Sequence, residues 1–367
     1  MQLARRALST TLVLLWSLVI AWLPVQAQSP AFFTAADGAI YYFGRTQRAD
    51  AVLWTWAASG LRVAYMNSTS LVLRFRAQNF DEDSSANRTR RVWYRIDGGE
   101  WLALDIPPNS AADYPLNAPN NKGRHTLDVV KASEGQLIFE GITLEPGGKL
   151  ARPAIPSRRI EIVGDSITVG FRINGGGSYD IPGDHDARAA YGWQLGELLN
   201  AEVRLIAVTG RGLVHDFGAG PNDSHAMPTY YPYLQRGYPF PNDWSWQPGI
   251  IVVNLGTNDM APPAPTAPDA FLSAYVNLLT LLRIDNPRAL IVALQPFGLE
   301  NGSIPVYPKE IRAAVLARQS AGDGRVIYID TAHWLGPGDF TDGVHPNAQG
   351  NRKAAARLAG ILLSSPR

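Results

Sequence analysis

The chain has 367 residues, of which 46% are hydrophobic and 18% charged, a composition that excludes collagen-like, coiled-coil and wholly disordered proteins. Its 33 basic and 32 acidic residues nearly cancel, so we expect no nucleic-acid partner. Cysteine is absent, which excludes disulfides, thiol nucleophiles and cysteine-ligated zinc. The 34 glycines and 27 prolines favour a turn-rich protein with a substantial β component.

The first 27 residues have the pattern of a secretory signal peptide. Arg5 and Arg6 precede an apolar run over residues 12–23, and Val25 and Ala27 are suitably placed for cleavage after Ala27. A retained membrane anchor is the alternative, but the run is shorter than the about 20 residues that a helix needs to cross a bilayer. We therefore predict a secreted, extracytoplasmic protein with no stable membrane insertion after cleavage.

Residues 28–150 are predicted to form a jelly-roll β-sandwich. Apolar residues alternate over residues 71–76 and again over residues 92–96, and Asp97-Gly98-Gly99 then supplies a tight turn before Trp101. Further strands are predicted at residues 53–56, 62–65, 125–130 and 137–144. No helical repeat of apolar residues competes in this part, which favours two packed antiparallel sheets.

Residues 151–367 show a different pattern, which follows a linker rich in proline and glycine at residues 146–156. Short apolar strands alternate there with amphipathic helices, which predicts a parallel sheet covered by helices. The predicted strands are residues 160–163, 203–208, 250–255, 290–294 and 325–329, and the predicted helices are residues 189–199, 271–283, 309–318 and 348–363.

Four polar or glycine-rich clusters lie after strands or before the last helix. They are Gly164-Asp165-Ser166-Ile167, Thr209-Gly210-Arg211-Gly212, Gly256-Thr257-Asn258-Asp259 and Asp342-Gly343-Val344-His345. Because functional sites of open parallel sheets lie at the carboxyl ends of the strands, we expect the four clusters to form one site.

The residue types in these clusters are those of acyl transfer through a serine. Ser166 is the candidate nucleophile and His345 the candidate base, because a hydroxyl needs a nearby base to take its proton. Asp342, three residues before His345, can accept the other imidazole N–H and fix the tautomer. The backbone N–H groups of Ser166 and Gly210 and the amide of Asn258 would form the oxyanion hole.

Each of these residues has a plainer interpretation when taken alone. Asp165-Ser166 is also a good helix N-cap, and Gly210 could be an ordinary turn glycine. Asn258 could cap the loop that follows its strand, and a lone histidine before proline is commonly a loop residue. The occurrence of all four clusters in order favours the catalytic interpretation. Gly212 stays an alternative to Gly210 in the oxyanion hole.

The four clusters resemble the four sequence blocks of the SGNH (GDSL) hydrolases. The resemblance implies a three-layer α/β/α domain over residues 151–367, with Ser166 as nucleophile, His345 as base and Asp342 as the third triad member. It also assigns Gly210 and Asn258 to the oxyanion hole. The early Gly-Asp-Ser motif differs from the Gly-x-Ser-x-Gly elbow of α/β-hydrolases and disfavours that superfamily.

The chain further resembles carbohydrate esterase family 2, in which a β-sandwich precedes the SGNH domain. Phe43-Gly44-Arg45-Thr46, Tyr94-Arg95-Ile96-Asp97-Gly98-Gly99 and Gly210-Arg211-Gly212 carry this resemblance. It implies removal of O-acetyl groups from polysaccharides such as xylan or mannan, with a leaning towards primary 6-O positions. We predict that the enzyme needs no cofactor. Some members use a backbone carbonyl in place of the acid, whereas Asp342 indicates a full triad here.

Aromatic side chains are the candidate contacts for a sugar substrate. Trp334, close in sequence to His345, is the predicted substrate-binding residue. A second set of rings could wall a cleft or could simply pack beneath a loop, namely Tyr230, Tyr231, Tyr233, Tyr238, Trp244 and Trp246. Asp184-His185-Asp186 lacks a third well-spaced ligand, so we interpret it as a solvated turn and predict no metal site.

Two other functions remain compatible with the sequence. An SGNH enzyme can act on other acyl esters as a lipase or thioesterase, and the chain could be a carbohydrate-binding protein with little catalysis. The complete set of Ser166, Asn258, Asp342 and His345 argues against lost catalysis. The sequence thus predicts a secreted serine esterase acting on acetylated carbohydrate.

Overall fold

The computed structural model describes residues 29–77, 88–175, 183–219, 225–236, 240–262 and 264–364. The predicted signal peptide and Tyr238 lie outside the described residues. Within these ranges, no helix combines the length and the apolar character that crossing a bilayer requires.

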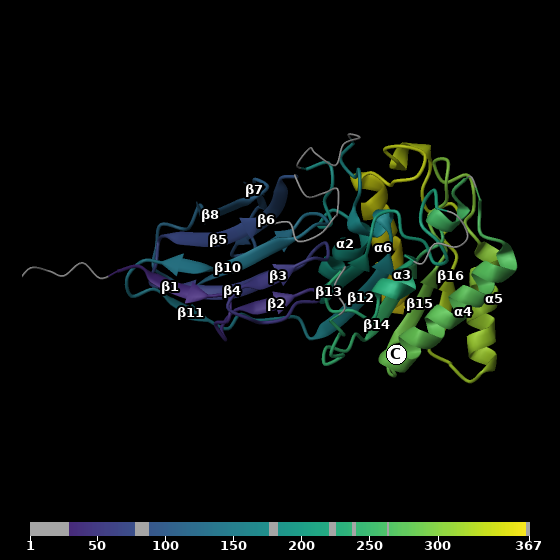
Figure 1. Cartoon of the computed structure of the whole chain (residues 1–367), viewed down its shortest axis with the longest axis horizontal. Coiled ribbons are helices and arrows are strands. Elements are labelled where there is room, and N and C mark those ends of the chain that lie inside the picture. Colours follow the sequence, from purple (N-terminus) through teal and green to yellow (C-terminus); the bar gives the residue numbers. More distant parts are fainter. Residues whose placement is uncertain are drawn as a thin grey trace, which may run out of the picture.

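Two antiparallel sheets form the N-terminal part of the molecule (Figure 1). The first has the order β1 (Ala31–Thr34), β10 (Leu137–Leu144), β5 (Leu71–Ala77) and β8 (Ser110–Pro115), with β3 (Val52–Trp54) also paired to β10. The second has the order β11 (Lys149–Ala151), β4 (Gly60–Met66), β9 (His125–Lys131), β6 (Arg90–Ile96) and β7 (Leu102–Ile106), with β2 (Tyr41–Phe43) beside β4.

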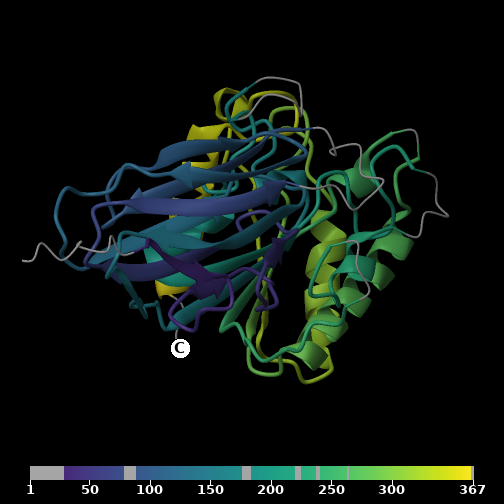
Figure 2. The ribbon, with the colours of Figure 1, turned by 60° about the vertical axis from the view of Figure 1, so that its left-hand side comes forward.

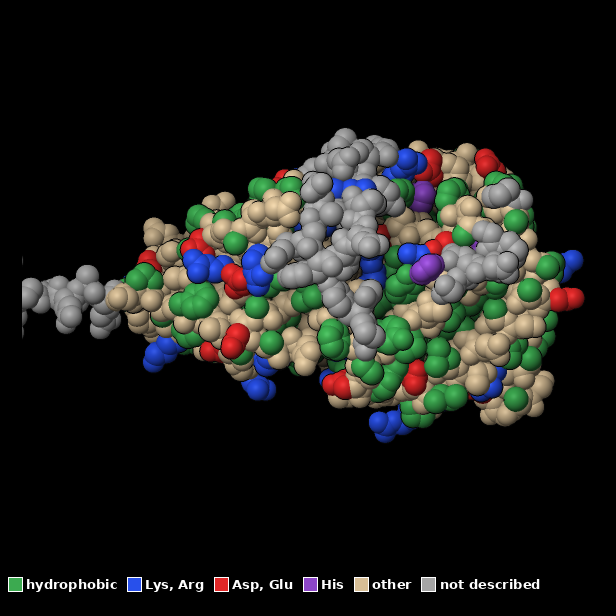
Figure 3. Space-filling view, viewed as in Figure 1, with side chains coloured by type: hydrophobic (Ala, Val, Ile, Leu, Met, Phe, Trp, Pro, Cys, Tyr) green, Lys and Arg blue, Asp and Glu red, His purple; other side chains and the backbone are tan. Residues whose placement is uncertain are grey.

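The apolar faces of the two sheets meet in one core, as the alternating pattern predicts. Leu71, Leu73 and Phe75 of β5 are buried there, while Arg74 and Arg76 face outward. These arginines form ion pairs with acidic side chains of the neighbouring strands β8 and β10, each at 2.7 Å. Figure 3 shows charged side chains of both signs interspersed over one face of the sandwich. The predicted β-sandwich and its β6–β7 hairpin are confirmed.

The C-terminal part is a parallel sheet between two layers of helices. Its strand order is β13 (Ala201–Ala207), β12 (Arg158–Gly164), β14 (Ile250–Asn254), β15 (Leu290–Leu294) and β16 (Val326–Ile329). Helices α2 (Tyr191–Leu199) and α6 (Ala348–Ser364) pack in one core with one face of the sheet. Helices α4 (Pro268–Asp285) and α5 (Pro308–Ser320) cover the other face and stand on the right in Figure 2.

The helix pattern in the sequence matches these layers. The apolar side chains at positions 271, 275, 278 and 282 are all buried on the sheet-facing side of α4. Two short helices escaped prediction, α1 (Ser166–Val169) and α3 (Met227–Tyr230), because four residues are too few to show a helical period. The predicted α/β/α layering is confirmed.

The two parts pack directly against each other. Phe43 and Val130 of the sandwich belong to the same buried cluster as α2 and the parallel sheet. The predicted boundary between residues 150 and 151 falls in β11, the last strand of the sandwich, and β12 begins at Arg158. We propose that residues 28–150 and 151–367 are the two domains.

A buried ion pair also links the two parts. Arg45, which follows β2, is fully buried, and its Nη2 atom lies 3.3 Å from the carboxylate of Glu161 in the middle of β12. The Arg45 guanidinium stacks on the Tyr231 ring at 4.6 Å, and the Tyr231 hydroxyl donates to Glu161 at 2.8 Å. At least two of the aromatic rings predicted as wall or packing residues are therefore packing residues, since Tyr231 and Trp246 are buried.

Candidate active site

The first cluster lies where β12 ends and α1 begins. Asp165 is the N-cap of α1, and its Oδ1 accepts the backbone N–H of Ile167 at 3.0 Å. This cap fixes the start of the helix and presents Ser166, whose surface is 4% exposed, at its first position. The capping interpretation and the nucleophile prediction thus describe neighbouring residues of one turn.

Ser166, His345 and Asp342 form a continuous hydrogen-bonded chain. The Nε2 atom of His345 lies 3.0 Å from the Oγ of Ser166, although the two residues are 179 positions apart. The Nδ1 atom of His345 lies 2.9 Å from Oδ2 of Asp342. This is the geometry in which an imidazole can take the serine proton while the carboxylate stabilises the resulting imidazolium.

The loop before α6 folds back on itself to bring Asp342 and His345 together. The backbone N–H of Thr341 donates to the carbonyl of His345 at 2.9 Å, and Phe340 pairs with Pro346. Oδ1 of Asp342 also accepts the backbone N–H groups of Val344 and His345, at 2.8 and 2.7 Å. Burial alone would raise the pKa of Asp342, but the hydrogen bonds from the ring and backbone of His345 hold it well below its usual range.

Two neighbours of this chain were not predicted from the sequence. Arg172 places its Nη1 atom 3.2 Å from Oδ2 of Asp342, so the carboxylate faces a guanidinium as well as the imidazole. The ring of Phe171 lies against His345, with ring centres 4.9 Å apart, and stacks on His185 at 4.5 Å. Both residues come shortly after α1, so the segment that follows Ser166 contacts both His345 and Asp342.

The two glycines of the second cluster, Gly210 and Gly212, have different surroundings. Gly210 has a φ of +80°, and among the described residues a Cβ built there would come within 4.0 Å only of Phe217. At Gly212 a Cβ would come within 2.1 Å of the His215 carbonyl and 2.7 Å of the Asp259 carboxylate. Gly212 is therefore required by close packing, whereas Gly210 is required by its backbone conformation.

A side chain of the sandwich holds this loop in place. Oε1 of Glu134, in the turn between β9 and β10, accepts the backbone N–H of Thr209 at 3.1 Å. The same oxygen lies 2.7 Å from Nη1 of Arg236, which orients the carboxylate. The N-terminal part thus contacts the residue immediately before Gly210, a link that no local sequence pattern indicates.

Asn258 joins the second and third clusters to the first. It begins the short 3-10 helix Asn258–Met260 after β14 and is 6% exposed. Its Nδ2 donates to the carbonyl of Arg211 at 2.9 Å and, over a longer 3.4 Å, to Oδ2 of Asp165. The amide therefore lies between the Gly210 loop and the Ser166 turn, where it can supply a donor to a developing oxyanion.

Two buried acids lie beneath this site. Asp259 accepts the backbone N–H groups of Leu213 and Val214 at 2.7 Å each, which fixes the loop that follows Gly212. Burial, together with the charge of Asp259, raises the pKa of Asp165 to about 7. Asp165 therefore changes its charge within the neutral pH range, directly beneath Ser166 and Asn258.

The raised pKa of Asp165 predicts a pH-dependent loss of stability. The folded protein retains this proton up to about pH 7, whereas an unfolded aspartate loses it near 3.9, so stability falls as pH rises from about 4 to about 7. Asp165→Asn keeps a capping oxygen and cannot ionise. Between pH 5 and pH 8 the wild type should lose about 3 kcal/mol more unfolding free energy than this variant, measured by urea denaturation. Equal losses of unfolding free energy in the wild type and the variant would contradict the raised pKa of Asp165.

Two other sequence predictions meet a different environment. Trp334 is only 8% exposed and packs near Phe297 in the core, so a substrate contact by this ring stays a prediction. The prediction of a solvated turn at residues 184–186 was wrong. His185 and Asp186 are buried, because Phe171 stacks on the imidazole and Arg188 pairs with the carboxylate at 2.9 Å. Among the described residues, no group of three His, Asp or Glu side chains could hold a metal ion.

Comparisons with known proteins identify both parts of the chain. A family model for the GDSL-like lipase/acylhydrolase family matches residues 162–353, and the carbohydrate esterase 2 N-terminal model matches residues 42–153. A curated relative, an acetylxylan esterase/glucomannan deacetylase of Cellvibrio japonicus, is 26% identical over 340 residues, which cover 84% of this chain and 90% of the relative.

Solved structures show the same two-part arrangement. A family 2 carbohydrate esterase of Cellvibrio japonicus matches with a TM-score of 0.76 and 25% identity, covering 91% of this chain and 97% of that one. A family 2 enzyme of Myceliophthora fergusii, solved with a carbohydrate-binding domain, matches with a TM-score of 0.71 and 27% identity over 89% of this chain and 98% of that one. This chain therefore belongs to the GDSL-like lipase/acylhydrolase family, as a carboxylic ester hydrolase with the N-terminal domain of carbohydrate esterase family 2.

Proposed function

We propose that the protein is a secreted serine esterase that removes O-acetyl groups from carbohydrates, without a cofactor. The observation that carries the proposal is the 3.0 Å contact between Ser166 Oγ and His345 Nε2, with Asp342 on the other side of the imidazole. Secretion rests on the pattern of the first 27 residues, and the substrate class rests on the similarity to a named acetylxylan esterase/glucomannan deacetylase.

In the proposed mechanism, His345 takes the proton of Ser166 as Oγ attacks the acetyl carbonyl. The C–O bond to the sugar then breaks, and His345 returns the proton to the departing sugar oxygen. Water activated by His345 next attacks the acetyl-enzyme and releases acetate, which restores the serine. Asp342 stays ionised throughout, since its pKa is held below its usual range, and stabilises the imidazolium in both steps.

The oxyanion of each tetrahedral intermediate would be stabilised by three donors. These are the backbone N–H groups of Ser166 and Gly210 and the Nδ2 amide of Asn258, each worth roughly 2.7–4 kcal/mol where such a donor has been removed from an enzyme. Asn258 can serve by exchanging its long 3.4 Å contact with Asp165 for the oxyanion while it keeps the Arg211 carbonyl.

An exposed ring lies next to this proposed oxyanion hole. Phe217 is 67% exposed, and its backbone N–H donates to the carbonyl of Gly210 at 2.7 Å. An exposed apolar ring whose backbone is bonded at this point is suited to packing against the C–H face of the sugar that carries the ester. We assign a first substrate contact to Phe217, and a contact by the largely buried Trp334 stays a prediction.

Hydrolysis of acetyl and longer esters tests the proposal. The enzyme should release acetate from acetylated xylan, acetylated glucomannan or a 6-O-acetyl hexoside, measured by an acetate assay. It should also hydrolyse 4-nitrophenyl acetate at least tenfold faster, in kcat/KM, than 4-nitrophenyl octanoate. A preference for octanoate would instead indicate a lipase or thioesterase, and no turnover of any ester would favour a binding protein.

A further inference from the structure

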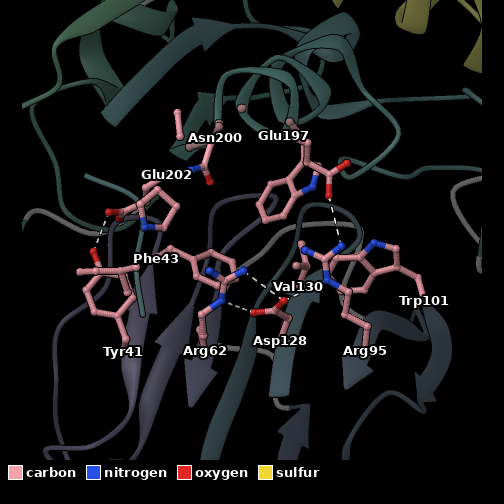
Figure 4. Close-up of a pocket in the computed structure, with 16 residues that line it drawn as sticks. Tyr41, Phe43, Arg62, Arg95, Trp101, Asp128, Val130, Glu197, Asn200 and Glu202 are labelled. Carbon is pink, nitrogen blue, oxygen red and sulfur yellow. Dashed lines mark hydrogen bonds and ion pairs between the residues drawn. The ribbon is translucent and has the colours of Figure 1, made fainter. Parts of the chain in front are cut away.

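A cavity of about 310 Å³ lies between the sandwich and the α/β part (Figure 4). Strands β2, β4, β9 and β6 form one wall, and α2 with the first residues of β13 forms the other. Figure 4 shows Tyr41, Arg62, Asp128 and Arg95 extending from the sandwich strands towards Glu197 and Asn200 of the α/β part. The proposed catalytic mechanism uses none of these residues.

The cavity lies at the opposite edge of the parallel sheet from Ser166. Residues 201–203, which line it, pair with residues 158–160 at the start of β12, whereas Ser166 follows the other end of that strand. At about 3.3 Å per residue, the two ends of β12 are roughly 20 Å apart. A ligand in the cavity would therefore be distinct from the group attached to Ser166.

The cavity is lined by aromatic rings. Trp101 comes from the sandwich and Trp193 from α2, and both are partly exposed. The guanidinium of Arg95 lies 4.3 Å from the ring centre of Trp101, and Phe43 packs against Trp193 with ring centres 5.7 Å apart. These contacts restrict both indoles, so little side-chain freedom would be lost when a ligand packs against them.

The polar side chains that line the cavity nearly balance one another in charge. Asp128 accepts from both Arg62 and Arg95, the second at 2.9 Å, and Arg95 also lies 3.5 Å from Glu197. The Tyr41 hydroxyl donates to Oε2 of Glu202 at 2.6 Å. Among the described side chains that line the cavity, each charge has a partner, which disfavours a phosphate or another strongly charged ligand.

We propose that this cavity is a second carbohydrate-binding site, which takes one or two sugar rings of a neutral chain. Indole rings offer apolar faces to pyranose C–H groups, and carboxylate, guanidinium and amide groups pair with hydroxyls that both donate and accept. The volume is at the lower end of ordinary ligand sites. Asn200 and Ile155 at its lining are exposed, so a chain can enter from solvent. The site does not depend on the esterase chemistry.

Binding at the cavity can be observed directly with ¹⁹F NMR. Full-length Ser166→Ala protein is labelled with 5-fluorotryptophan, and Trp101→Phe and Trp193→Phe identify the two cavity resonances. Xylohexaose and mannohexaose are then titrated as probes. At least one of them should shift both resonances in a saturable manner, while the resonance of the fully buried Trp56, outside the cavity lining, stays unchanged.

Matched substitutions on α2 and its C-cap locate the contact. Asn200 has a φ of +46°, which glycine tolerates, so Glu197→Ala combined with Asn200→Gly removes two polar groups with little change to the backbone. This variant should raise the dissociation constant at least fivefold. Leu198→Ala, on the exposed side of the same helix and outside the cavity lining, should leave it unchanged.

Two results would overturn the proposal. One is the absence of a saturable shift at the Trp101 and Trp193 resonances up to about 10 mM of either hexaose, ten times a millimolar dissociation constant. The other is a shift that the Glu197→Ala and Asn200→Gly substitutions do not weaken. In both cases the cavity would be only a solvent-filled space between the sandwich and the α/β part, with no sugar-binding role. Hydrolysis of 4-nitrophenyl acetate is measured separately, so either result leaves the test of the esterase function intact.

Discussion

Replacing Ser166 with alanine should lower kcat/KM for 4-nitrophenyl acetate by roughly 10⁴–10⁶-fold and leave the fold unchanged. The substitution removes the oxygen that lies 3.0 Å from His345 Nε2, so no acetyl-enzyme can form. Alanine fits the same helix position, and the N-cap bond from Ile167 to Asp165 does not involve the Ser166 side chain. The melting temperature and circular dichroism spectrum should therefore match those of the wild type.

Covalent labelling gives a second measurement of the same prediction. A serine-directed phosphonate should modify the wild type at Ser166, identified by mass spectrometry, and should leave Ser166→Ala unlabelled. Ser245→Ala changes an exposed serine whose hydroxyl bonds Asp243, and it should keep both labelling and activity. Turnover by Ser166→Ala within tenfold of the wild type would contradict the assignment of the nucleophile.

Asp342→Asn should lower kcat by about 10⁴-fold, the second largest effect that we expect. The carboxylate accepts the Nδ1 hydrogen of His345 and two backbone N–H groups, whereas an amide can present its NH₂ group to the ring and favour the wrong tautomer. The ion pair between Arg172 and this carboxylate would be lost at the same time. Rates with 4-nitrophenyl acetate between pH 5 and pH 9 would measure the loss.

The matched control for Asp342→Asn is Asp330→Asn, which neutralises an exposed aspartate of the same domain. This control should keep its full rate. A rate close to that of the wild type for Asp342→Asn would show that another acceptor, such as a backbone carbonyl, can orient His345. Such a result would support the Ser-His dyad that some members of the family are expected to use.

The fold was largely predictable because its main signals are local. Alternation of apolar side chains in β5 and the helical period of α4 appear within a few residues, and both faces are buried as expected. Strand β8 gave no such signal. Most of its residues are exposed, and it is a strand because it pairs with β5, about 40 positions away.

The site was predictable to the extent that its chemistry is written in short motifs. The serine, histidine, aspartate and asparagine occur in four clusters that parallel-strand topology brings together. The residues that support the site from outside these clusters belong to no recognisable motif. Arg172 meets Asp342 across 170 positions, and Glu134 reaches Thr209 from the other domain, so their contacts depend on the finished packing. The cavity between the domains could not be predicted for the same reason.

The Arg45–Glu161 pair bears on how such proteins are assembled during evolution. A recombination event that replaced the N-terminal domain would remove the guanidinium from a carboxylate inside the central sheet of the esterase, and breaking a buried pair typically costs about 3–5 kcal/mol. Much of a typical domain's stability would be lost in that single exchange. Successful shuffling should therefore transfer both halves as one heritable unit, with the arginine and the glutamate inherited together.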